Sequence, residues 1–528
     1  MIIALMISQF PPKHVAVGDW LMLHGSTGHN GFGALRGRIS GWSVKYTVSL
    51  CTGESQPVVG DINADGLPEI VFGCLGGLGA SVIALRGNTG STLWSTSYPG
   101  GSWGAPAAAD LIPSIPGLEV VVCSSTNTQL LRGTDGSVIW TASVGCGSNA
   151  GAPAVAHDGP DTLILVNDDG TLYALNPLTG SVRWSAPSGG NTLIGIAKSP
   201  AINDIDGDGN LEVVVAGNGT VYAYDFRTGA ALWSVSVGTR YYTRTPATLV
   251  DLTGDCVDEV IVSNDNGHIY ALRGTDGSVL WDYVISGQMA CGPISTADLN
   301  GDSINDVIVG HLRTCSCGTP GGVTVINGAS GLPLWSNTFT GPNMTHGGGR
   351  VVSDFDSDGQ LEIAVVPYWS SYMCFGDGVF RMFNGTGGIE WTAGGVVGEG
   401  SSFADVDGDG CSEILVLPSA GRNILVVVDN DAVSDCGAYP YNDTCGIIGS
   451  NDETDVSEAS ISYVFTEVEG RDGGILIKSN RNSLVRIYRP DGRLVLTRGV
   501  LAGETFLNLK PGTYVVLINR RSFTVLVR

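Results

Sequence analysis

The sequence is poor in charged residues, and basic residues are scarcer still. Asp, Glu, Lys and Arg make up 15% of the 528 residues, and 27 basic residues against 51 acidic ones leave a formal net charge of −24. A negative field of this size repels nucleic acid and anionic membrane surfaces, so neither is expected as a partner. No run of 18 or more apolar residues occurs, so the sequence predicts no membrane-spanning helix.

Common catalytic and zinc motifs are also missing. The sequence has no H-E-x-x-H or P-loop motif, and its seven His residues are scattered. Its twelve Cys residues include no CxxC pair with a matching His or Cys pair, so a zinc site is not expected. Cys436 and Cys445 are close enough in sequence to staple a loop in an oxidising compartment, whereas most Cys residues can equally be small buried apolar residues.

Glycine, by contrast, is abundant. Its 77 copies stand among short runs rich in Val and Ile, a pattern that predicts many short strands joined by tight turns. Because 528 residues exceed what one ordinary hydrophobic core can hold, we expect either two domains or one large repeat array.

One phrase recurs about every 50 residues and defines a repeat. Each copy runs from an apolar stretch, usually through an Asp-rich turn, to an apolar strand, a Gly turn and a Trp. The terminal Trp residues are 52, 46, 44, 49, 48, 54 and 56 residues apart and are Trp42, Trp94, Trp140, Trp184, Trp233, Trp281, Trp335 and Trp391. Four short strands fit into one such period, which is typical of a propeller blade.

The two ends of the repeat array complement each other. The last unit starts near Ser401 and has the Asp-rich turn but no terminal Trp, whereas residues 32–49 include Trp42 but no Asp-rich turn. Together they would make one blade shared by both ends of the array, which removes the free sheet edges. Seven complete units and this shared one predict an all-β fold with an eight-bladed β-propeller over residues 30–430.

The Trp phrases YALNPLTGSVRW and YAYDFRTGAALW resemble the A-x-D-x-x-T-G-x-x-x-W repeat of the quinoprotein, or PQQ-like, propeller family. The resemblance covers nearly all of residues 30–430 and implies an eight-bladed fold. It does not by itself imply bound pyrroloquinoline quinone, because scaffold proteins without enzymatic activity share the repeat. The vicinal Cys pair common in quinoprotein dehydrogenases is missing here, with only the approximate match of Cys315 and Cys317.

Six of the units carry the acidic pattern D-x-[DNT]-x-D-x-x-x-[ED] between their first and second strands. The polar residues always stand at positions 1, 3, 5 and 9 of this loop. The six sets are Asp61, Asn63, Asp65 and Glu69; Asp204, Asp206, Asp208 and Glu212; Asp251, Thr253, Asp255 and Glu259; Asp298, Asn300, Asp302 and Asp306; Asp354, Asp356, Asp358 and Glu362; and Asp405, Asp407, Asp409 and Glu413.

This spacing suits calcium. Ca2+ takes six to eight oxygen ligands in a compact shell, and oxygens at positions 1, 3 and 5 of a tight loop point inward together. Position 7 would add its backbone carbonyl and position 9 would close the shell, while glycines such as Gly207 and Gly209 permit the sharp turn. Carboxylates held this closely repel one another without a cation. We therefore expect about six structural Ca2+ sites, of which the loops with Thr253 and Asn300 are the weaker.

The acidic pattern resembles the FG-GAP, or integrin-α-type, calcium loop in phrases such as NDIDGDGNLEVVVAG. Two units depart from it. The second unit has Asp110 but no inner acid, and the third has only Asp158 and Asp161 in this region. No calcium is expected in these two units, whose turns would be held by backbone and Asx hydrogen bonds.

Past residue 430 the repeat ends. Residues 431–460 are rich in Asp, Asn, Ser and Gly and are predicted to be a linker, and residues 461–528 alternate apolar and polar residues as in a small β-sandwich. The phrases VRIYRPDGRLV, LKPGTYVVLI and TVLVR resemble the C-terminal sorting domain of the type IX secretion system. The resemblance implies contact with that machinery and a secreted or outer cell-surface location. Residues 1–29 are apolar at first but lack a basic region and a cleavage site, so a truncated signal stays open.

We expect the propeller to be a binding, adhesion or scaffold module rather than an enzyme. Its protein or glycan ligand would bind on the face opposite the calcium loops, where the predicted connections carry Trp103 and residues 240–244, 311–322, 344–346 and 367–378. A calcium-dependent polysaccharide lyase, with Arg240, Tyr242, Arg244 or His346 as base, is the alternative. An oxidoreductase of the PQQ type is the less favoured one.

Overall fold

Each repeat folds into one antiparallel sheet, because its apolar runs are short and are separated by Gly- and Asp-rich turns. The chain forms two compact units, one holding strands β1–β33 and the other β34–β40, and each is described by itself. In this computed structural model the described residues are 29, 36–49, 56–74, 81–98, 104–147, 151–158, 161–189, 199–238, 246–264, 266–290, 293–312, 321–339, 350–366, 379–394, 401–416, 424–429 and 436, and the seven strands β34–β40.

The first four blades follow one another along the chain. Their strands are, for blade 1, β2 (Val58–Gly60), β3 (Glu69–Cys74), β4 (Ser81–Arg86) and β5 (Thr92–Ser97); for blade 2, β6 (Ala107–Ala109), β7 (Glu119–Cys123), β8 (Thr128–Arg132) and β9 (Val138–Ala142); for blade 3, β10 (Ala154–Asp158), β11 (Asp161–Asp168), β12 (Thr171–Leu175) and β13 (Val182–Pro187); and for blade 4, β14 (Ala201–Asn203), β15 (Glu212–Gly217), β16 (Thr220–Asp225) and β17 (Ala231–Ser236).

The other four blades repeat this order with two variations. Blade 6 has its first strand in two pieces, and blade 8 takes its fourth strand from the start of the chain. The strands are, for blade 5, β18 (Thr248–Val250), β19 (Glu259–Ser263), β20 (His268–Leu272) and β21 (Val279–Val284); for blade 6, β22 (Met289–Ala290), β23 (Ser295–Ala297), β24 (Asp306–Leu312), β25 (Gly321–Ile326) and β26 (Pro333–Thr338); for blade 7, β27 (Arg350–Ser353), β28 (Glu362–Val365), β29 (Val379–Asn384) and β30 (Ile389–Gly394); and for blade 8, β31 (Ser401–Ala404), β32 (Glu413–Val416), β33 (Ile424–Val428) and β1 (Val44–Ser49).

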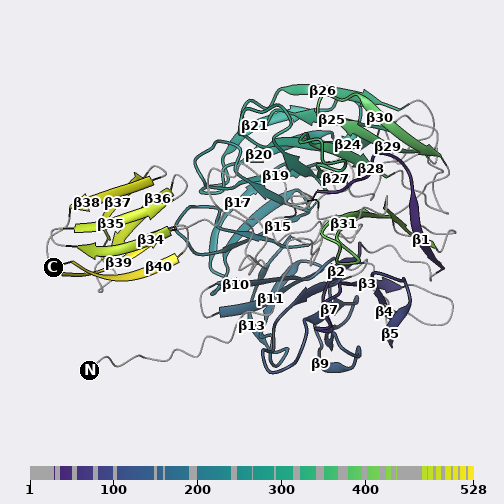
Figure 1. Cartoon of the computed structure of the whole chain (residues 1–528), viewed down its shortest axis with the longest axis horizontal. Helices are drawn as coiled ribbons and strands as arrows, with labels where there is room; N and C mark the ends of the chain where they lie inside the picture. The colour runs from purple at the N-terminus through teal and green to yellow at the C-terminus, as the bar shows by residue number, and fades with distance from the viewer. Residues whose placement is uncertain are drawn as a thin grey trace. The chain divides into compact units, whose positions relative to one another are not determined.

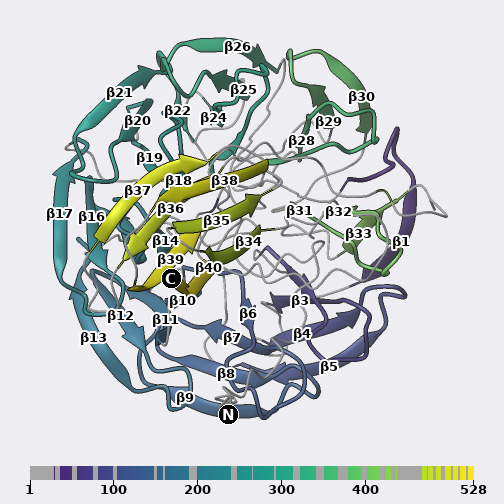
Figure 2. The same cartoon turned by 60° about the vertical axis from the view of Figure 1, so that its left-hand side comes forward.

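The eight sheets stand in a ring with their first strands innermost (Figure 1). Figure 2 shows first strands such as β6, β14 and β18 toward the centre and fourth strands such as β5, β9 and β17 on the rim. Burial follows the same order, since every residue of β15 is buried whereas β17 alternates exposed and half-buried positions. The predicted all-β, eight-bladed propeller is confirmed.

The ring closes in blade 8, where two distant parts of the chain share one sheet. Strand β1 pairs antiparallel with β33 from Val44 opposite Val428 to Ser49 opposite Ile424. The sheet order β1-β33-β32-β31 therefore combines residues near both ends of the propeller. Because β1 completes this sheet, β33 is not left as a free edge.

Neighbouring blades are joined by the repeated Trp residues. In six seams the indole Nε1 donates a hydrogen bond of 2.6–3.0 Å to a backbone carbonyl in the hairpin turn of the next blade. The pairs are Trp94–Gly133, Trp140–Pro177, Trp184–Phe226, Trp233–Gly274, Trp281–Gly328 and Trp335–Gly385. A glycine two or three residues further on lies against the indole; at Gly136, with φ of 69°, a Cβ would stand 2.6 Å from a ring carbon. The Trp repeat thus marks the contact between one blade and the next.

The docking aromatic of blade 8 is Tyr46, so the prediction that Trp42 takes this place is wrong. Tyr46 lies in β1 and donates a hydrogen bond to the Gly87 carbonyl, as the terminal Trp residues of blades 1 to 6 do in their seams. Trp42 precedes the strand and packs on Phe380 of blade 7, with ring centroids 5.3 Å apart. The spacing of the Trp residues gave the wrong docking residue because the N-terminal segment enters the ring between blades 7 and 8 before β1 begins.

The predicted link between Cys436 and Cys445 is also wrong. Cys436 forms a disulfide with Cys411, at the seventh position of the blade 8 acidic loop, and Cys445 lies outside the described residues. A second disulfide joins Cys123, at the end of β7, to Cys146 in blade 2. Both bonds connect residues more than 20 positions apart, which short sequence spacing could not indicate.

The second unit is all-β in its described strands. Its three-stranded sheet has the order β34 (Thr466–Arg471), β35 (Gly474–Ser479) and β38 (Gly503–Asn508), and its four-stranded sheet the order β37 (Leu494–Val500), β36 (Ser483–Tyr488), β39 (Gly512–Ile518) and β40 (Arg521–Val527). Face-to-face packing as a sandwich stays a prediction, and the domain boundaries at residues 430 and 460 lie outside the described residues.

A second glycine explains how closely the blades approach. At the docking carbonyl of blades 1, 2 and 5 stand Gly87, Gly133 and Gly274, and a Cβ there would lie 2.0–2.1 Å from a carbonyl oxygen of the preceding blade's acidic loop. Blades 3 and 4 follow blades without that loop, and they have Pro177 and Phe226 at the same place. The size of the residue at the docking carbonyl of one blade therefore depends on whether the preceding blade has an acidic loop.

Gly133→Ala is expected to lower the free energy of unfolding by about 1 to 3 kcal/mol, because the added methyl group has no space. A Cβ at Gly133 would stand 2.1 Å from the Ile62 oxygen and 2.3 Å from the Leu118 oxygen, and both are backbone atoms that cannot rotate away. Gly394→Ala is the matched control, since a Cβ at Gly394 meets nothing within 4 Å. Equal denaturant stability of the two variants would contradict the tight seam.

Candidate metal centres in the acidic loops

The six acidic loops connect the first and second strands of blades 1, 4, 5, 6, 7 and 8 and share one backbone conformation. Positions 4 and 6 have positive φ in all six, between 64° and 90°. Four of these twelve positions are not glycine: Ala64, Cys256, Ser303 and Ser357. Left-handed backbone at non-glycine residues costs free energy, so the tertiary structure holds the loops in this shape.

The first Asp of the loop orders the turn through its backbone amides. In blade 4 Asp204 accepts hydrogen bonds from the amides of Gly207 at 2.7 Å and Gly209 at 2.9 Å. In blade 8 Asp405 accepts the equivalent bonds from Gly408 at 2.6 Å and Gly410 at 3.0 Å. These bonds place the carboxylate inside the turn rather than toward solvent.

The residues at positions 3 and 5 cap the amides two residues further along. Asp206 Oδ1 accepts from the Asp208 amide at 3.0 Å, and Asp208 Oδ1 accepts from the Asn210 amide at 2.7 Å. The blade 1, 6, 7 and 8 loops repeat both bonds at 2.8 to 3.3 Å. The polar side chains of the loop therefore surround a common centre.

The carboxylate at position 9 comes from the start of the second strand and is buried. One of its oxygens accepts the backbone amide of position 2, as Glu362 does from Phe355 at 2.7 Å and Glu413 from Val406 at 2.7 Å. The other oxygen, Oε1, of Glu362 and of Glu413 is buried without a hydrogen-bond partner, although the two residues are only 1% and 0% exposed. A buried carboxylate oxygen without a hydrogen-bond partner is costly, and a proton or a cation would lower that cost.

Three of the six predicted sets bring their acidic oxygens together among the residues the structure describes. The sets Asp204–Asp206–Glu212, Asp354–Asp356–Glu362 and Asp405–Asp407–Glu413 each place one oxygen per residue within 4.8 Å of the others. These three loops have Asp at position 3. Carboxylate oxygens at this spacing suit a hard divalent cation such as Ca2+.

The other three loops differ at position 3. In blade 1 the Asn63 amide nitrogen donates to Glu69 at 2.7 Å and to Asp65 at 3.1 Å, and in blade 6 Asn300 donates to Asp306 at 3.2 Å. In blade 5 the Thr253 side chain is exposed and its amide donates to Asp251 at 2.9 Å. The described geometry thus groups blade 1 with the two loops predicted to be weaker sites.

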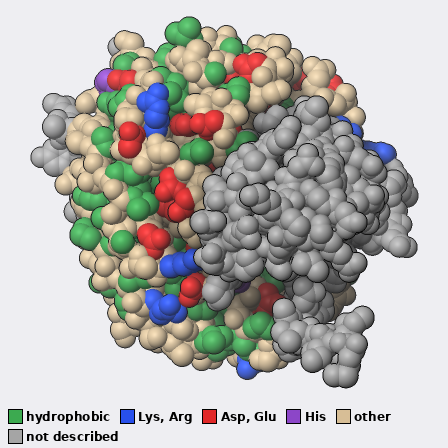
Figure 3. All heavy atoms as spheres, turned by 90° about the vertical axis from the view of Figure 1, so that its left-hand side faces the viewer, with side chains coloured by type: hydrophobic (Ala, Val, Ile, Leu, Met, Phe, Trp, Pro, Cys, Tyr) green, Lys and Arg blue, Asp and Glu red, His purple; other side chains and the backbone are tan. Residues whose placement is uncertain are grey.

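The electrostatics of the loops favour either protons or a cation. Burial, together with the nearby Asp405 and Asp407 carboxylates, raises the pKa of Glu413 to about 10. Burial is also the main cause that raises the pKa of Glu362 to about 9 and of Glu212 to about 8. Acidic side chains gather in several separate clusters on the face shown in Figure 3.

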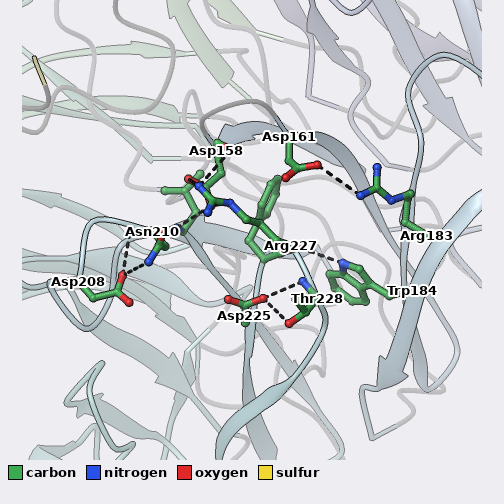
Figure 4. A network of polar contacts seen from close by, with 11 residues as sticks. Asp158, Asp161, Arg183, Trp184, Asp208, Asn210, Asp225, Arg227 and Thr228 are labelled. Carbon is green, nitrogen blue, oxygen red and sulfur yellow. Dashed lines mark hydrogen bonds and ion pairs between the residues drawn. The ribbon is translucent and has the colours of Figure 1, made fainter. Parts of the chain in front are cut away.

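Blades 2 and 3 stabilise the same region without an acidic loop. In blade 2 Glu119, at the start of β7, accepts the amides of Leu111 at 2.9 Å and Ile112 at 2.8 Å. In blade 3 the hairpin between β10 and β11 places Asp158 against the guanidinium of Arg227 from blade 4, with two contacts of 2.7 Å (Figure 4). A protein cation therefore neutralises the acid of blade 3, a pairing that the sequence did not reveal.

Most of the connections that the sequence predicts to bind a ligand lie outside the described residues. Trp103 and residues 240–244, 344–346 and 367–378 lie outside the described residues, as do Cys315 and Cys317. His311 is described and is 1% exposed, with its Nε2 atom 3.0 Å from Thr324 Oγ1. Its neighbours make it a packed core residue.

The fold and the Trp-docked seams agree with the comparisons to known proteins. The family model described as outer membrane protein assembly factor BamB matches residues 74–194 and 131–364. The two matches together cover residues 74–364, which is more than half of the 528 residues. The chain therefore belongs to this family of PQQ-like propeller proteins.

Individual relatives are distant. Protein FAM234B of Mus musculus is 29% identical over 210 residues, which are 33% of this chain and 33% of that protein, so the chain matches about a third of its curated relative. The quinohemoprotein alcohol dehydrogenase of Comamonas testosteroni has a TM-score of 0.57 at 14% identity, covering 79% of this chain and 81% of that one. The alcohol dehydrogenase ADHIIG of Pseudomonas putida HK5 also has 0.57, at 12% identity over 82% and 86%. Such likeness shows the fold alone.

No helix long and apolar enough to cross a membrane occurs among the described residues.

The raised pKa of the position 9 carboxylates predicts an unusual pH dependence for the metal-free protein. A Glu has a pKa near 4.3 when unfolded, so a folded pKa of about 10 for Glu413 means that the folded state holds the extra proton between these values. The stabilising contribution is complete below pH 4 and is lost as pH rises. In EDTA the melting temperature should fall from pH 5 to pH 9.

Glu413→Gln supplies the comparison, because the amide cannot ionise. Its melting temperature in EDTA should depend less on pH than that of the wild type. Identical pH slopes for the two proteins would show that Glu413 is not the titrating group.

Proposed function

We propose that the protein is an extracytoplasmic propeller, stabilised by calcium, that serves as a binding or scaffold module. The observation that carries the proposal is the shared backbone of the six acidic loops, with a buried and unpartnered carboxylate oxygen at position 9 in blades 7 and 8. A cation at the loop centre would give these oxygens a partner and neutralise the neighbouring carboxylates.

Calcium fits the donors better than other common ions. The loop side chains at positions 1, 3, 5 and 9 offer only oxygen or, in blades 1 and 6, an amide whose oxygen can replace its nitrogen by rotation. Zinc and copper prefer nitrogen and sulfur, and magnesium binds with fewer protein ligands. About six sites would result, with Asp61, Asp298 and Asp251 in the three weaker loops.

The disulfides support a location outside the cytoplasm. The Cys123–Cys146 and Cys411–Cys436 bonds would persist in an oxidising compartment and would be reduced in most cytosols. The resemblance of residues 461–528 to a type IX sorting domain points in the same direction. We therefore propose a secreted or outer cell-surface protein delivered by that machinery.

The proposed binding role rests on the family and on the ring-shaped propeller fold. The family model is described as an outer membrane protein assembly factor, which supports a scaffold role. The calcium loops occupy one end of the blades, and the opposite face would receive a protein or glycan ligand. A polysaccharide lyase or PQQ-type oxidoreductase stays an untested alternative. A glycan array and a uronic-acid lyase assay on the purified chain separate a ligand from a substrate, since turnover would overturn the binding role.

Calcium should bind the purified chain and raise its melting temperature. Calcium at one hundred times its Kd stabilises a protein by about 2.7 kcal/mol per site. Metal analysis after dialysis should find several calcium ions per chain, and Asp206→Asn should lower that number by about one. Asp161→Asn, in the blade 3 hairpin, is the control and should leave it unchanged. A chain without bound calcium, with the same melting curve in EDTA and in calcium, would overturn the proposal.

A further inference from the structure

The N-terminal segment that closes the ring lies directly on two acidic loops. We define the closing segment as residues 36–49, which include β1. Its backbone accepts or donates hydrogen bonds at both loops, with Gly37 N to Asp354 O at 3.0 Å, Ile39 N to Phe355 O at 2.6 Å and Ser412 N to Arg36 O at 2.9 Å. The closing segment therefore touches the first two positions of the blade 7 loop and position 8 of the blade 8 loop.

Lys45 brings a positive charge into the blade 8 loop. Its Nζ atom lies 2.5 Å from Asp407 Oδ2 and 2.6 Å from Asp429 Oδ2, and the three side chains are 16%, 15% and 4% exposed. Asp407 is position 3 of the loop, and its carboxylate belongs to the cluster with Asp405 and the buried Glu413. The unpartnered Oε1 atom of Glu413 shows that Lys45 does not satisfy the whole cluster.

Arg36 brings a positive charge into the blade 7 loop. Its Nε atom lies 2.9 Å from Oδ2 of Asp354, the first residue of that loop, whose side chain is 0% exposed. The other oxygen of Asp354 and the Oε1 atom of Glu362 are buried without a hydrogen-bond partner. Both basic residues therefore use only part of the acidic oxygens around them.

Blade 4 offers an internal comparison with the same four acids. Its loop also reads Asp, Asp, Asp and Glu at positions 1, 3, 5 and 9, and these carboxylates form no ion pair with any basic residue that the structure describes. The blade 4 loop can therefore receive a divalent cation without losing a salt bridge. In blade 8 the cation and Lys45 would share the Asp407 carboxylate.

A disulfide and a backbone hydrogen bond also hold the blade 8 loop, independently of Lys45. The Cys411–Cys436 disulfide ties position 7 of the loop to the chain beyond β33, and the Cys436 amide donates to the Gly410 carbonyl at 3.2 Å. The loop can therefore keep its shape when Lys45 moves away from Asp407.

We propose that the closing segment and calcium compete for the acidic loops of blades 7 and 8, with Arg36 and Lys45 as tethered competitors. The inference rests on the proposed calcium binding. Two positive charges that share a carboxylate repel each other, so each weakens the binding of the other by the same factor. The blade 4 loop is then a tight structural site, whereas the blade 8 loop fills at higher calcium and loosens β1 as it does so.

Hydrogen–deuterium exchange across a calcium titration of the full chain tests this competition separately for each acidic loop. In the wild type, amides of residues 405–413 should become protected at a higher calcium concentration than those of residues 204–212. Lys45→Met should lower the midpoint for residues 405–413 by about tenfold, which is an ordinary size for such coupling. Arg183→Met removes a charge that pairs with Asp161 in blade 3, away from the acidic loops, and should leave both midpoints unchanged.

The wild type also tests the reciprocal effect, should Lys45→Met fold poorly. Saturating calcium should speed amide exchange in β1, residues 44–49, while it slows exchange in the blade 4 loop. Unchanged midpoints in Lys45→Met, or slower exchange of β1 in calcium, would overturn the competition while calcium binding itself stands. A wild type without calcium-dependent protection in any loop would instead overturn the proposed function.

Discussion

The contact between a terminal aromatic residue and the next hairpin turn is the constraint on which the ring depends. Six Trp residues donate their indole N–H to a carbonyl of the following blade, and Tyr46 does the same with its hydroxyl group at the closing seam. The indole also packs on a turn glycine with positive φ, so apolar contact and hydrogen bond act at the same point. Blades 1 to 6 and blade 8 are thereby each tied to the following blade at the rim.

The acidic loops are part of the same seams. The carbonyl at position 2 of the blade 1 loop stands 2.1 Å from where a Cβ on Gly133 of blade 2 would be, and the amide of that position donates to the buried carboxylate in the five other loops. A cation that orders a loop would therefore also order the contact with the next blade. Blade 3 achieves this with Arg227, and the closing segment brings Lys45 and Arg36 to blades 8 and 7. Acids of blades 3, 7 and 8 thus meet basic side chains that come from other parts of the chain.

The repeat predicted much of this architecture because propeller blades contact mainly their neighbours in sequence. The period of the Trp residues indicated the number of strands and blades, and the regular spacing of acids identified all six loops before their shared backbone was known. The errors lie where the chain leaves the repeat. Trp42 matches the phrase but packs on Phe380, and Cys436 pairs with Cys411 rather than with the nearest Cys in the tail.

The sequence by itself determined the eight-bladed fold and which loops are acidic, because both follow from local patterns of period 2 and from repetition. Only the tertiary structure decided which aromatic residue closes the ring, which acids converge within 4.8 Å and which basic side chains lie among them. The pairing of Lys45 with Asp407 spans more than 360 residues, and that of Arg227 with Asp158 crosses from one blade to the next. Such contacts arise from the closure of the ring, and no local pattern encodes them.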